Sequence, residues 1–236
     1  MESVNILNRL RKIIILYATP KFVYLNKFVK TSRSNYKIKV LDVGCGNRSP
    51  STTISLFPQI EYYGLDKEDY NLTIEDKKIL LENNRYFKVD LENLSQLDNS
   101  LPDNYFDFII MNHVIEHTIS GLDILKILVK KVKVGGGIYI EFPSVKSLSF
   151  PSMPGTLNFC DDDTHVRLYD LKEIANVLLE SGLKVIKGGT RRNLVSIIVM
   201  PVKVIYHILK YRKILGSAFW DISGFSEYIY AIKKRR

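Results

Sequence analysis

A chain of 236 residues, 46% of them hydrophobic, is long enough to bury the core of one α/β domain with an extension or two. Its two cysteines, Cys45 and Cys160, lie far apart in the sequence, which excludes a dense disulfide scaffold and favours a reducing compartment, the cytoplasm. The sequence shows no signal-peptide pattern and no apolar run of the roughly 18 residues that a membrane span needs, so we expect no membrane-spanning segment.

The net charge of +9 at pH 7 is distributed unevenly along the chain. Residues 1–40 contain nine Lys and Arg against one acid, and residues 191–236 contain ten against two, whereas the centre between them is acidic overall. Basic flanks of this kind favour an anionic partner such as lipid headgroups, nucleic acid or a phosphorylated substrate. The alternative is that these side chains only solvate the surface.

The first expected element is a basic amphipathic segment over residues 1–37, and one domain follows over residues 38–236. Helix-like stretches lie within this domain, the clearest over residues 120–136 with glycines at its end. Apolar strands that alternate with such helices predict a parallel sheet covered by helices on both faces. Five of the strands are predicted at residues 38–44, 60–66, 85–90, 105–111 and 136–143.

The second part of the chain continues this alternation after a loop rich in proline. A helix over residues 169–182 is expected to begin at the N-cap Asp170 and to end at Gly182. Residues 191–223 are apolar and basic and too long for a hairpin turn, so we interpret them as an insertion that carries an amphipathic helix. The remaining strands are expected at residues 183–189 and 226–234.

The first predicted strand ends in the stretch VLDVGCGNRS, residues 40–49, which contains two glycines. Gly44 and Gly46 let the backbone approach a ligand, and the open amides of the following helix attract its polar groups. As a dinucleotide-binding fingerprint the stretch is weak, because Ser49 stands where a third glycine belongs. Asp42 would also repel a pyrophosphate, so the loop suits a ligand with a positive end.

Acids follow the next two predicted strands. Asp66 is placed for the hydroxyls of a ribose, and Asp90 with Leu91 can face a purine. A ribose, a purine and a cationic amino-acid tail together describe S-adenosylmethionine. With VLDVGCG, YYGLD, YFKVD, FDFIIMNHVIEH and GGGIYIEFP in this order and spacing, the chain resembles the class I S-adenosylmethionine-dependent methyltransferases, of type 11/23, over roughly residues 38–190 and the last strand.

This resemblance implies a Rossmann-like sheet of seven strands, mostly parallel with an antiparallel last strand and with helices on both faces. The sequence departs from the family at Arg48, where a third glycine is common, which leaves the loop geometry open. The implied cofactor-binding residues are Asp42, Gly44, Cys45 and Gly46 at the methionine and ribose, Asp66 at the ribose hydroxyls, Asp90 and Leu91 at the adenine, and Asn112 at the sulfonium end.

The string HVIEH, residues 113–117, admits more than one interpretation. His113, Glu116 and His117 match the inverted zinc-peptidase signature, but that site needs a long helix and here the string follows a predicted strand. We expect a metal-free pocket, because a similar phrase recurs here in small-molecule methyltransferases. The alternative is a divalent ion, as in the small-RNA 3′-end and quinone-ring methyltransferases, with His165 as a further ligand. Mixed nitrogen and oxygen ligands would suit zinc, manganese or iron.

The implied reaction is an in-line transfer of the sulfonium methyl, in which the enzyme orients the reactants and removes a proton. A histidine near its ordinary pKa suits the base, so His165 is predicted first and His113 second. Substrate contacts are expected from Glu116, His117 and Arg167. The favoured activity is O-methylation of a small-molecule, glycan or lipid-linked hydroxyl. The alternatives are a metal-dependent RNA methyltransferase and a non-catalytic module that binds S-adenosylmethionine.

Both flanks combine Lys and Arg with large apolar side chains, which is typical of helices that lie in a membrane interface. We therefore expect a cytoplasmic protein with peripheral contact to anionic lipid at the inner membrane face, and nucleic acid is the less favoured partner. The alternative is that the flanks cap the active site.

Overall fold

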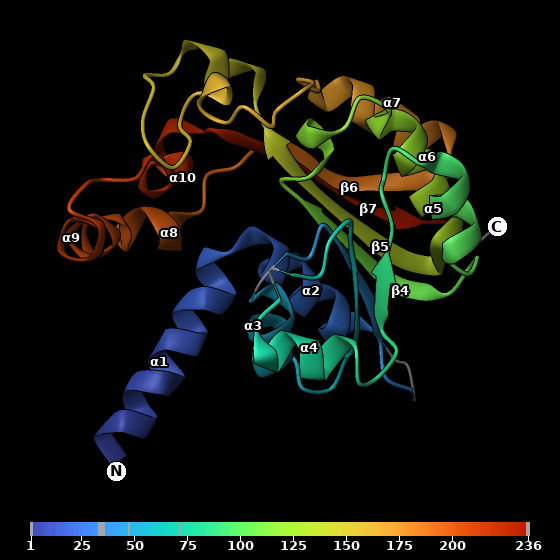
Figure 1. Ribbon diagram of the computed structural model, residues 1–236, viewed down its shortest axis with the longest axis horizontal. Coiled ribbons are helices and arrows are strands. Elements are labelled where there is room, and N and C mark those ends of the chain that lie inside the picture. Colours follow the sequence, from blue (N-terminus) through green and yellow to red (C-terminus); the bar gives the residue numbers. More distant parts are fainter. Residues whose placement is uncertain (1, 33–35, 47, 71, 235–236) are drawn as a thin grey trace.

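The computed structural model describes residues 2–32, 36–46, 48–70 and 72–234. These residues form one seven-stranded sheet with the strand order β3-β2-β1-β4-β5-β7-β6 (Figure 1). Neighbouring strands from β3 to β5 are parallel, whereas β7 runs antiparallel between β5 and β6. This arrangement confirms the expected sheet. Its strands are β1 Lys39–Val43, β2 Glu61–Asp66, β3 Tyr86–Lys88, β4 Phe106–Asn112, β5 Val132–Pro143, β6 Leu183–Thr190 and β7 Ser226–Lys233.

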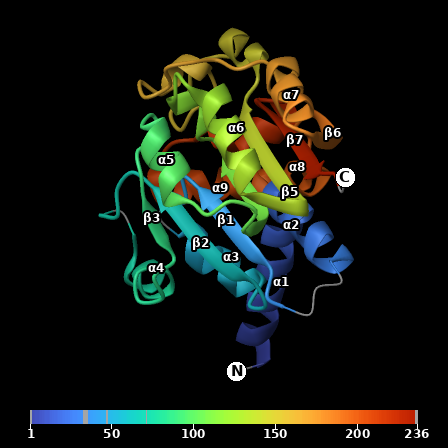
Figure 2. The same ribbon diagram turned by 90° about the vertical axis from the view of Figure 1, so that its right-hand side faces the viewer.

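Helices cover both faces of the sheet (Figures 1 and 2). They are α1 Glu2–Ala18, α2 Pro20–Thr31, α3 Ser49–Leu56, α4 Ile74–Leu80, α5 Leu94–Ser100, α6 Gly121–Lys131, α7 Leu171–Glu180, α8 Leu194–Ile198, α9 Met200–Tyr211 and α10 Trp220–Ser223. Side chains of β4 alternate between the faces: Ile109 and Met111 join the core beneath α6 and α7. Phe108 and Ile110 join the core beneath α2. Each face therefore buries its own apolar layer, as near-continuous apolar strands require.

The segment predicted over residues 1–37 is divided in the structure. Phe22, Leu25 and Phe28 of α2 are buried, and the rings of Phe28 and Phe108 lie 5.1 Å apart. The domain boundary therefore lies before α2 and not at residue 38, because the apolar side chains of α2 complete the core on that face. α1, by contrast, leaves most of its described side chains exposed.

The helix predicted over residues 120–136 ends earlier than its pattern suggests. α6 stops at Lys131, and β5 begins at Val132, which pairs with Phe106 of β4. The register shifts between Phe106 and Phe108, so the glycines that follow Val132 lie in an irregular stretch of strand. Sheet pairing outweighs the helical periodicity here, and the glycines do not cap the helix.

The cap and the stop of α7 agree with those predicted from the sequence. Asp170 accepts a hydrogen bond from the backbone N–H of Lys172 at 2.7 Å, and Gly182 follows with a φ of +88°. The insertion before β7 forms α8, α9 and α10, and α9 contains no buried residue. Within the described ranges, no helix combines the length and the apolar character that a membrane span requires.

Candidate active site

A cleft of about 520 Å³ opens where β1, β2, β3 and β4 reach their carboxyl ends. This is the edge at which α/β sheets bind ligands, and the volume is within the range of small-molecule sites. Four of the eight residues predicted to bind the cofactor therefore meet in one place. The wall of the cleft includes Gly44, Asp66, Asp90, Leu91, His113, Val114, His117 and Thr164.

The glycine loop after β1 lies against the loop after β4. Gly44 has a φ of +65°, and a Cβ there would stand 2.3 Å from Cγ2 of Val114, so the position requires glycine. Gly46 has a φ of +51°, and its N–H donates to Oδ2 of Asp66 at 2.9 Å. Apart from its chain neighbours, no heavy atom of the described residues lies within 4 Å of the place where a Cβ of Gly46 would stand. This open space beside a fixed backbone fits the close approach of a cofactor.

Arg48, where the family often has glycine, adopts a glycine-like backbone with a φ of +61°. Its N–H donates to Oδ2 of the buried Asp76 at 2.8 Å, and the N–H of Ser51 donates to Oδ1 at 3.0 Å. Burial would raise the pKa of Asp76, but hydrogen bonds from Thr73, Arg48 and Ser51 outweigh it and lower the pKa. The charged carboxylate thus holds the loop in shape without the third glycine.

Asp42 and Cys45 support this loop from within the protein, and their side chains are not part of the cleft wall. Oδ2 of Asp42 accepts hydrogen bonds from Ser49 at 2.6 Å and Tyr62 at 2.7 Å. Nζ of Lys21 lies 3.6 Å from the same oxygen. Asp42 and Cys45, predicted at the methionine and ribose, are both buried, and Oδ2 of Asp42 has partners within the protein. Their contact with the cofactor stays a prediction.

Two neighbours of the predicted acids also line the cleft, Lys67 after Asp66 and Glu92 after Asp90. Nζ of Lys67 lies 3.6 Å from Oδ2 of Asp90. Neither residue was predicted from the sequence, because neither belongs to a motif. Asn112 ends β4 but is not part of the cleft wall, where the next residue, His113, takes its place.

His113 is held between two buried carboxylates. Its Nδ1 lies 3.1 Å from Oε1 of Glu116, and its Nε2 lies 3.1 Å from Oε1 of Glu141. Burial alone would lower the pKa of His113, but the hydrogen bonds to Glu116 and Glu141 outweigh it and raise the pKa to about 9. Both ring nitrogens donate at neutral pH, so no lone pair is left to accept a proton. These contacts do not favour His113 as the second base, and its role stays a prediction.

Arg191 connects this histidine to the insertion. Its guanidinium donates to Oε1 of Glu141 at 2.6 Å and to Oδ2 of Asp221 at 2.7 Å. Burial would raise the pKa of Glu141, but Arg191 and His113 hold it below its ordinary value. The ring of Trp220 lies 4.6 Å from that of His113, centroid to centroid. Sequence reasoning missed this network, because only the fold brings its members together.

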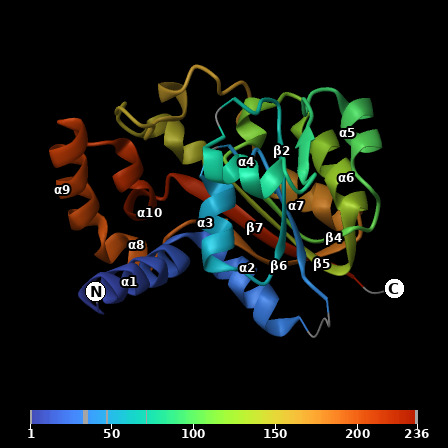
Figure 3. The same cartoon turned by 60° about the horizontal axis from the view of Figure 1, so that its bottom comes forward.

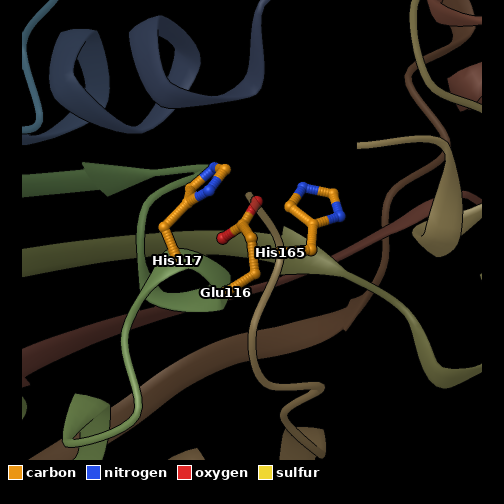
Figure 4. A group of neighbouring side chains, drawn as sticks. All are labelled: Glu116, His117 and His165. Atoms are coloured by element: carbon orange, nitrogen blue, oxygen red, sulfur yellow. The ribbon is translucent and has the colours of Figure 1, made fainter. Parts of the chain in front are cut away.

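Glu116, His117 and His165 form a separate polar cluster beside the cleft (Figure 4). One possible ligand atom of each lies within 4.8 Å of the others. Glu116 and His117 belong to the short 3-10 helix η1 Ile115–His117, and His165 comes from the loop before α7. Three of the four residues in the metal alternative therefore converge. His113 is the exception, because both of its nitrogens are occupied by carboxylates.

Arg167, predicted as a substrate contact, is engaged within the protein. Its Nη2 donates to Oε1 of Glu173 at 2.6 Å, and its Nη1 donates to the carbonyl of Ile119 at 2.9 Å. The guanidinium also lies 4.6 Å from the ring centre of Tyr169. These contacts fasten α7 to the preceding loops, and the role of Arg167 at the substrate stays a prediction.

The sheet order, the glycine loop after β1 and the acids after β2 and β3 define a class I methyltransferase whose cofactor is S-adenosylmethionine. A family model described as a methyltransferase domain matches residues 21–187, which is most of the chain. The chain belongs to this methyltransferase family.

Individual proteins are similar to this chain at low identity. An uncharacterized protein of Methanocaldococcus jannaschii is 28% identical over 117 residues, which are 48% of this chain and only 30% of that protein's length. A SAM-dependent methyltransferase from Archaeoglobus fulgidus has a TM-score of 0.54 at 21% identity, over 89% of this chain and 92% of that one. A third similar structure is phosphoethanolamine N-methyltransferase 2 from Haemonchus contortus, solved with phosphomonomethylethanolamine and S-adenosylhomocysteine. It has a TM-score of 0.57 at 14% identity, over 89% of this chain and 53% of that one. These structural likenesses show the fold alone.

Proposed function

We propose that this methyltransferase methylates a hydroxyl of an amphiphilic, lipid-linked acceptor that is presented at an anionic membrane surface. The observation that supports this acceptor is a surface formed by α1, α8 and α9, on which large apolar and basic side chains are exposed together. We call it the interfacial face. Figures 1 and 3 show these three helices gathered at one end of the molecule, and the amide of Asn193 donates to the carbonyl of Tyr17 at 2.7 Å to join them.

The apolar side chains of the interfacial face follow helical spacing. On α1 they are Ile6, Leu10, Ile13, Ile14 and Tyr17, which are 42–60% exposed. On α8 and α9 the stripe is Ile198, Val202, Ile205 and Leu209, which are 57–76% exposed. Water-exposed stripes of this length are unfavourable on a protein surface and are typical of helices that lie in a lipid interface.

The charge of the interfacial face has one sign. The sequence contains no Asp or Glu at residues 3–41 or at residues 191–220. Lys and Arg near an anionic membrane contribute about 1 kcal/mol each to binding. An RNA surface would use the charges but would gain nothing from exposed isoleucine and leucine, so the composition favours lipid. The exposed basic residues of α1 and of the end of α9 are Arg9, Arg11, Lys12, Lys210, Arg212 and Lys213. The three on α1 also line a cavity beside α3, where Nζ of Lys12 donates to the carbonyl of Ser55 at 3.0 Å.

The insertion that carries α8 and α9 also contacts the loop between β5 and α7. The N–H of Gly216 donates to the carbonyl of Pro154 at 2.8 Å, and the indole N–H of Trp220 donates to the carbonyl of Thr156 at 2.6 Å. The same loop continues to His165. These contacts support a route by which an acceptor anchored in lipid at the interfacial face reaches the cleft.

The chemistry requires an electrophilic methyl, which S-adenosylmethionine supplies as a sulfonium. The acceptor oxygen forms a bond to the methyl carbon while the carbon–sulfur bond breaks, its electron pair stays on sulfur, and the hydroxyl proton passes to a base. We assign that base to His165. Its Nδ1 lies 2.6 Å from the carbonyl of Phe159, to which it donates, so its Nε2 keeps an unpaired lone pair.

We infer a peripheral location at the cytoplasmic side of a membrane. Cys45 and Cys160 are both free thiols, which fits a reducing compartment. The interfacial face supplies the membrane contact, and steering by its charges weakens as salt rises.

Vesicle co-sedimentation tests the docking part of this proposal. The protein is expected to bind vesicles that contain phosphatidylglycerol and to bind phosphatidylcholine vesicles much more weakly. Replacing two residues of the α9 stripe, Ile205→Asp with Leu209→Asp, should weaken binding by about 100-fold, because each inserted side chain contributes at least about 1.5 kcal/mol.

The matched control replaces two apolar residues outside the interfacial face, Ile74→Asp with Val134→Asp, which are 91% and 55% exposed in the native protein. This control should bind vesicles as the native protein does. Equal binding by the α9 variant, or equal binding to neutral and anionic vesicles, would contradict membrane docking through this face.

A further inference from the structure

One carboxylate oxygen beside the cleft lacks a hydrogen-bond partner among the described residues. Glu116 is 1% exposed, and its Oε1 accepts a hydrogen bond from His113. Its Oε2 has no donor. Leaving a buried polar atom unsatisfied costs about 1–3 kcal/mol, and more for a charged group, so native proteins rarely leave one without a role. The unpartnered oxygen points to a ligand that carries positive charge.

Two histidines beside this oxygen present free lone pairs. Nδ1 of His117 lies 3.1 Å from the carbonyl of Thr164, and Nδ1 of His165 lies 2.6 Å from the carbonyl of Phe159. The hydroxyl of Thr164 also lies 3.0 Å from Nδ1 of His117, but it donates its proton to Oδ1 of Asp162 at 2.5 Å. A carbonyl can only accept, so each Nδ1 carries the proton and each Nε2 exposes its lone pair. Asp162 lies 4.0 Å from Nε2 of His165, beyond hydrogen-bond reach. A carbonyl on one ring nitrogen is how proteins orient an imidazole that binds metal with the other.

The backbone holds these three side chains in place. The N–H of Val166 donates to the carbonyl of Glu116 at 2.9 Å, which fastens the loop that carries His165 to η1. One possible ligand atom of each residue lies within 4.8 Å of the others (Figure 4). Ligands of a zinc-like ion at about 2.0–2.2 Å are themselves about 3.5 Å apart, so a contraction of about 1 Å completes the site.

We propose that Glu116 Oε2 and the Nε2 atoms of His117 and His165 bind one divalent first-row transition ion. Two imidazoles and one carboxylate form the ligand set of zinc and ferrous sites that keep an open coordination position. Magnesium and calcium prefer oxygen ligands and fit less well. His117 and Thr164 line the cleft, so the ion borders the space in which acceptor and methyl meet.

This site deepens the proposed function and rests on it in one respect, the identity of the acceptor group as a hydroxyl. If bound, the ion would lower the pKa of a hydroxyl at its open position, and that hydroxyl would release its proton to water more readily. The Nε2 lone pair of His165 would then bind the ion and not the proton, so His165 would act as a ligand in the ion-bound protein and as the base only in the ion-free protein. His113 remains outside the site, where its Nδ1 lies 3.1 Å from the other oxygen of Glu116.

Titration with Co²⁺ alone tests the site without any activity measurement. Chelator-treated protein should take up one Co²⁺ per chain and develop visible d–d absorption. His117→Gln, His165→Gln and Glu116→Gln should each weaken binding by at least about 10- to 100-fold, the loss known for outer partners of metal ligands. His207→Gln is the control, because His207 lies on α9 outside the cluster and should leave binding unchanged.

Circular dichroism and thermal melting of the ion-free variants establish that each is folded before titration. Failure of the native protein to bind Co²⁺ stoichiometrically, or native-like binding by folded His117→Gln and His165→Gln, overturns the inference. Stoichiometric binding without methyl transfer to lipid supports the ion site and contradicts only the proposed acceptor. Full transfer by ion-free protein, abolished by His165→Gln, overturns the ion and leaves His165 as the base.

Discussion

His113 shows how charge outweighs burial at a single position. It holds a left-handed backbone with a φ of +55° and places its ring between Glu116 and Glu141. A buried histidine would ordinarily be neutral, but two carboxylates in hydrogen-bond contact favour the imidazolium. The residue that the sequence ranked second as the base is therefore held between two carboxylates and favoured as a cation.

This fixed cation makes stability depend on pH. The pKa of His113 is about 9 in the folded protein, above its ordinary value of 6.5. Its contribution is therefore complete below pH 6.5 and is lost as the pH rises through 9. We expect urea denaturation to show a loss of about 2–3 kcal/mol in the free energy of unfolding between pH 6.5 and pH 9.5.

His113→Asn is the comparison for this pH dependence, because it removes the ionisable ring and keeps a polar side chain. The variant should be less stable than the native protein at pH 6.5, and the difference should shrink towards pH 9.5. Parallel stability curves for the two proteins would contradict the buried imidazolium.

The sequence could locate the residues that follow strands but not those that meet through the fold. Gly44, Asp66 and Asp90 are recognisable because each stands at the end of an apolar run, and the ends of parallel strands share one edge. Glu141 and Arg191 are 50 positions apart and belong to no motif. Glu141 lies in β5 and Arg191 directly follows β6. The two residues meet because β7 pairs with both of these strands.

Periodicity predicted most elements but failed where tertiary pairing competes with it. The limits of α7 followed from a cap and a glycine, which act locally. The boundary between α6 and β5 could not be predicted from local signals, because Val132 continues the helical pattern but pairs with β4. The sequence predicts that α1 and α2 are both basic and amphipathic, but only α2 packs its apolar face against the sheet.

The difference between α1 and α2 can be measured. Leu25→Ala removes a side chain of α2 that is fully buried and should lower the free energy of unfolding by about 2–5 kcal/mol through lost packing and a cavity. Leu10→Ala, on the exposed stripe of α1, should change it by less than about 0.5 kcal/mol. Equal losses in urea denaturation would contradict the assignment of α2 to the core and α1 to the surface.

At the scale of the whole molecule, two basic flanks from opposite ends of the sequence meet in one interfacial face. Composition predicted that both flanks contact an anionic partner, but it could not show that α1 and α8 adjoin each other. The same insertion reaches the cleft through Trp220, whose ring lies over His113. The proposed docking surface and the cleft are thus connected by contacts within one segment.

The proposed transfer to a lipid-linked hydroxyl is tested most directly by following the labelled methyl group. The protein is incubated with methyl-labelled S-adenosylmethionine and membranes of its own organism, and the products are partitioned between organic solvent, nucleic acid and water. We expect label in the organic phase, at least about 100-fold lower with His165→Gln, because a missing proton acceptor typically costs that much. Label in nucleic acid or in the aqueous phase, or no label at all, would contradict a lipid-linked hydroxyl acceptor.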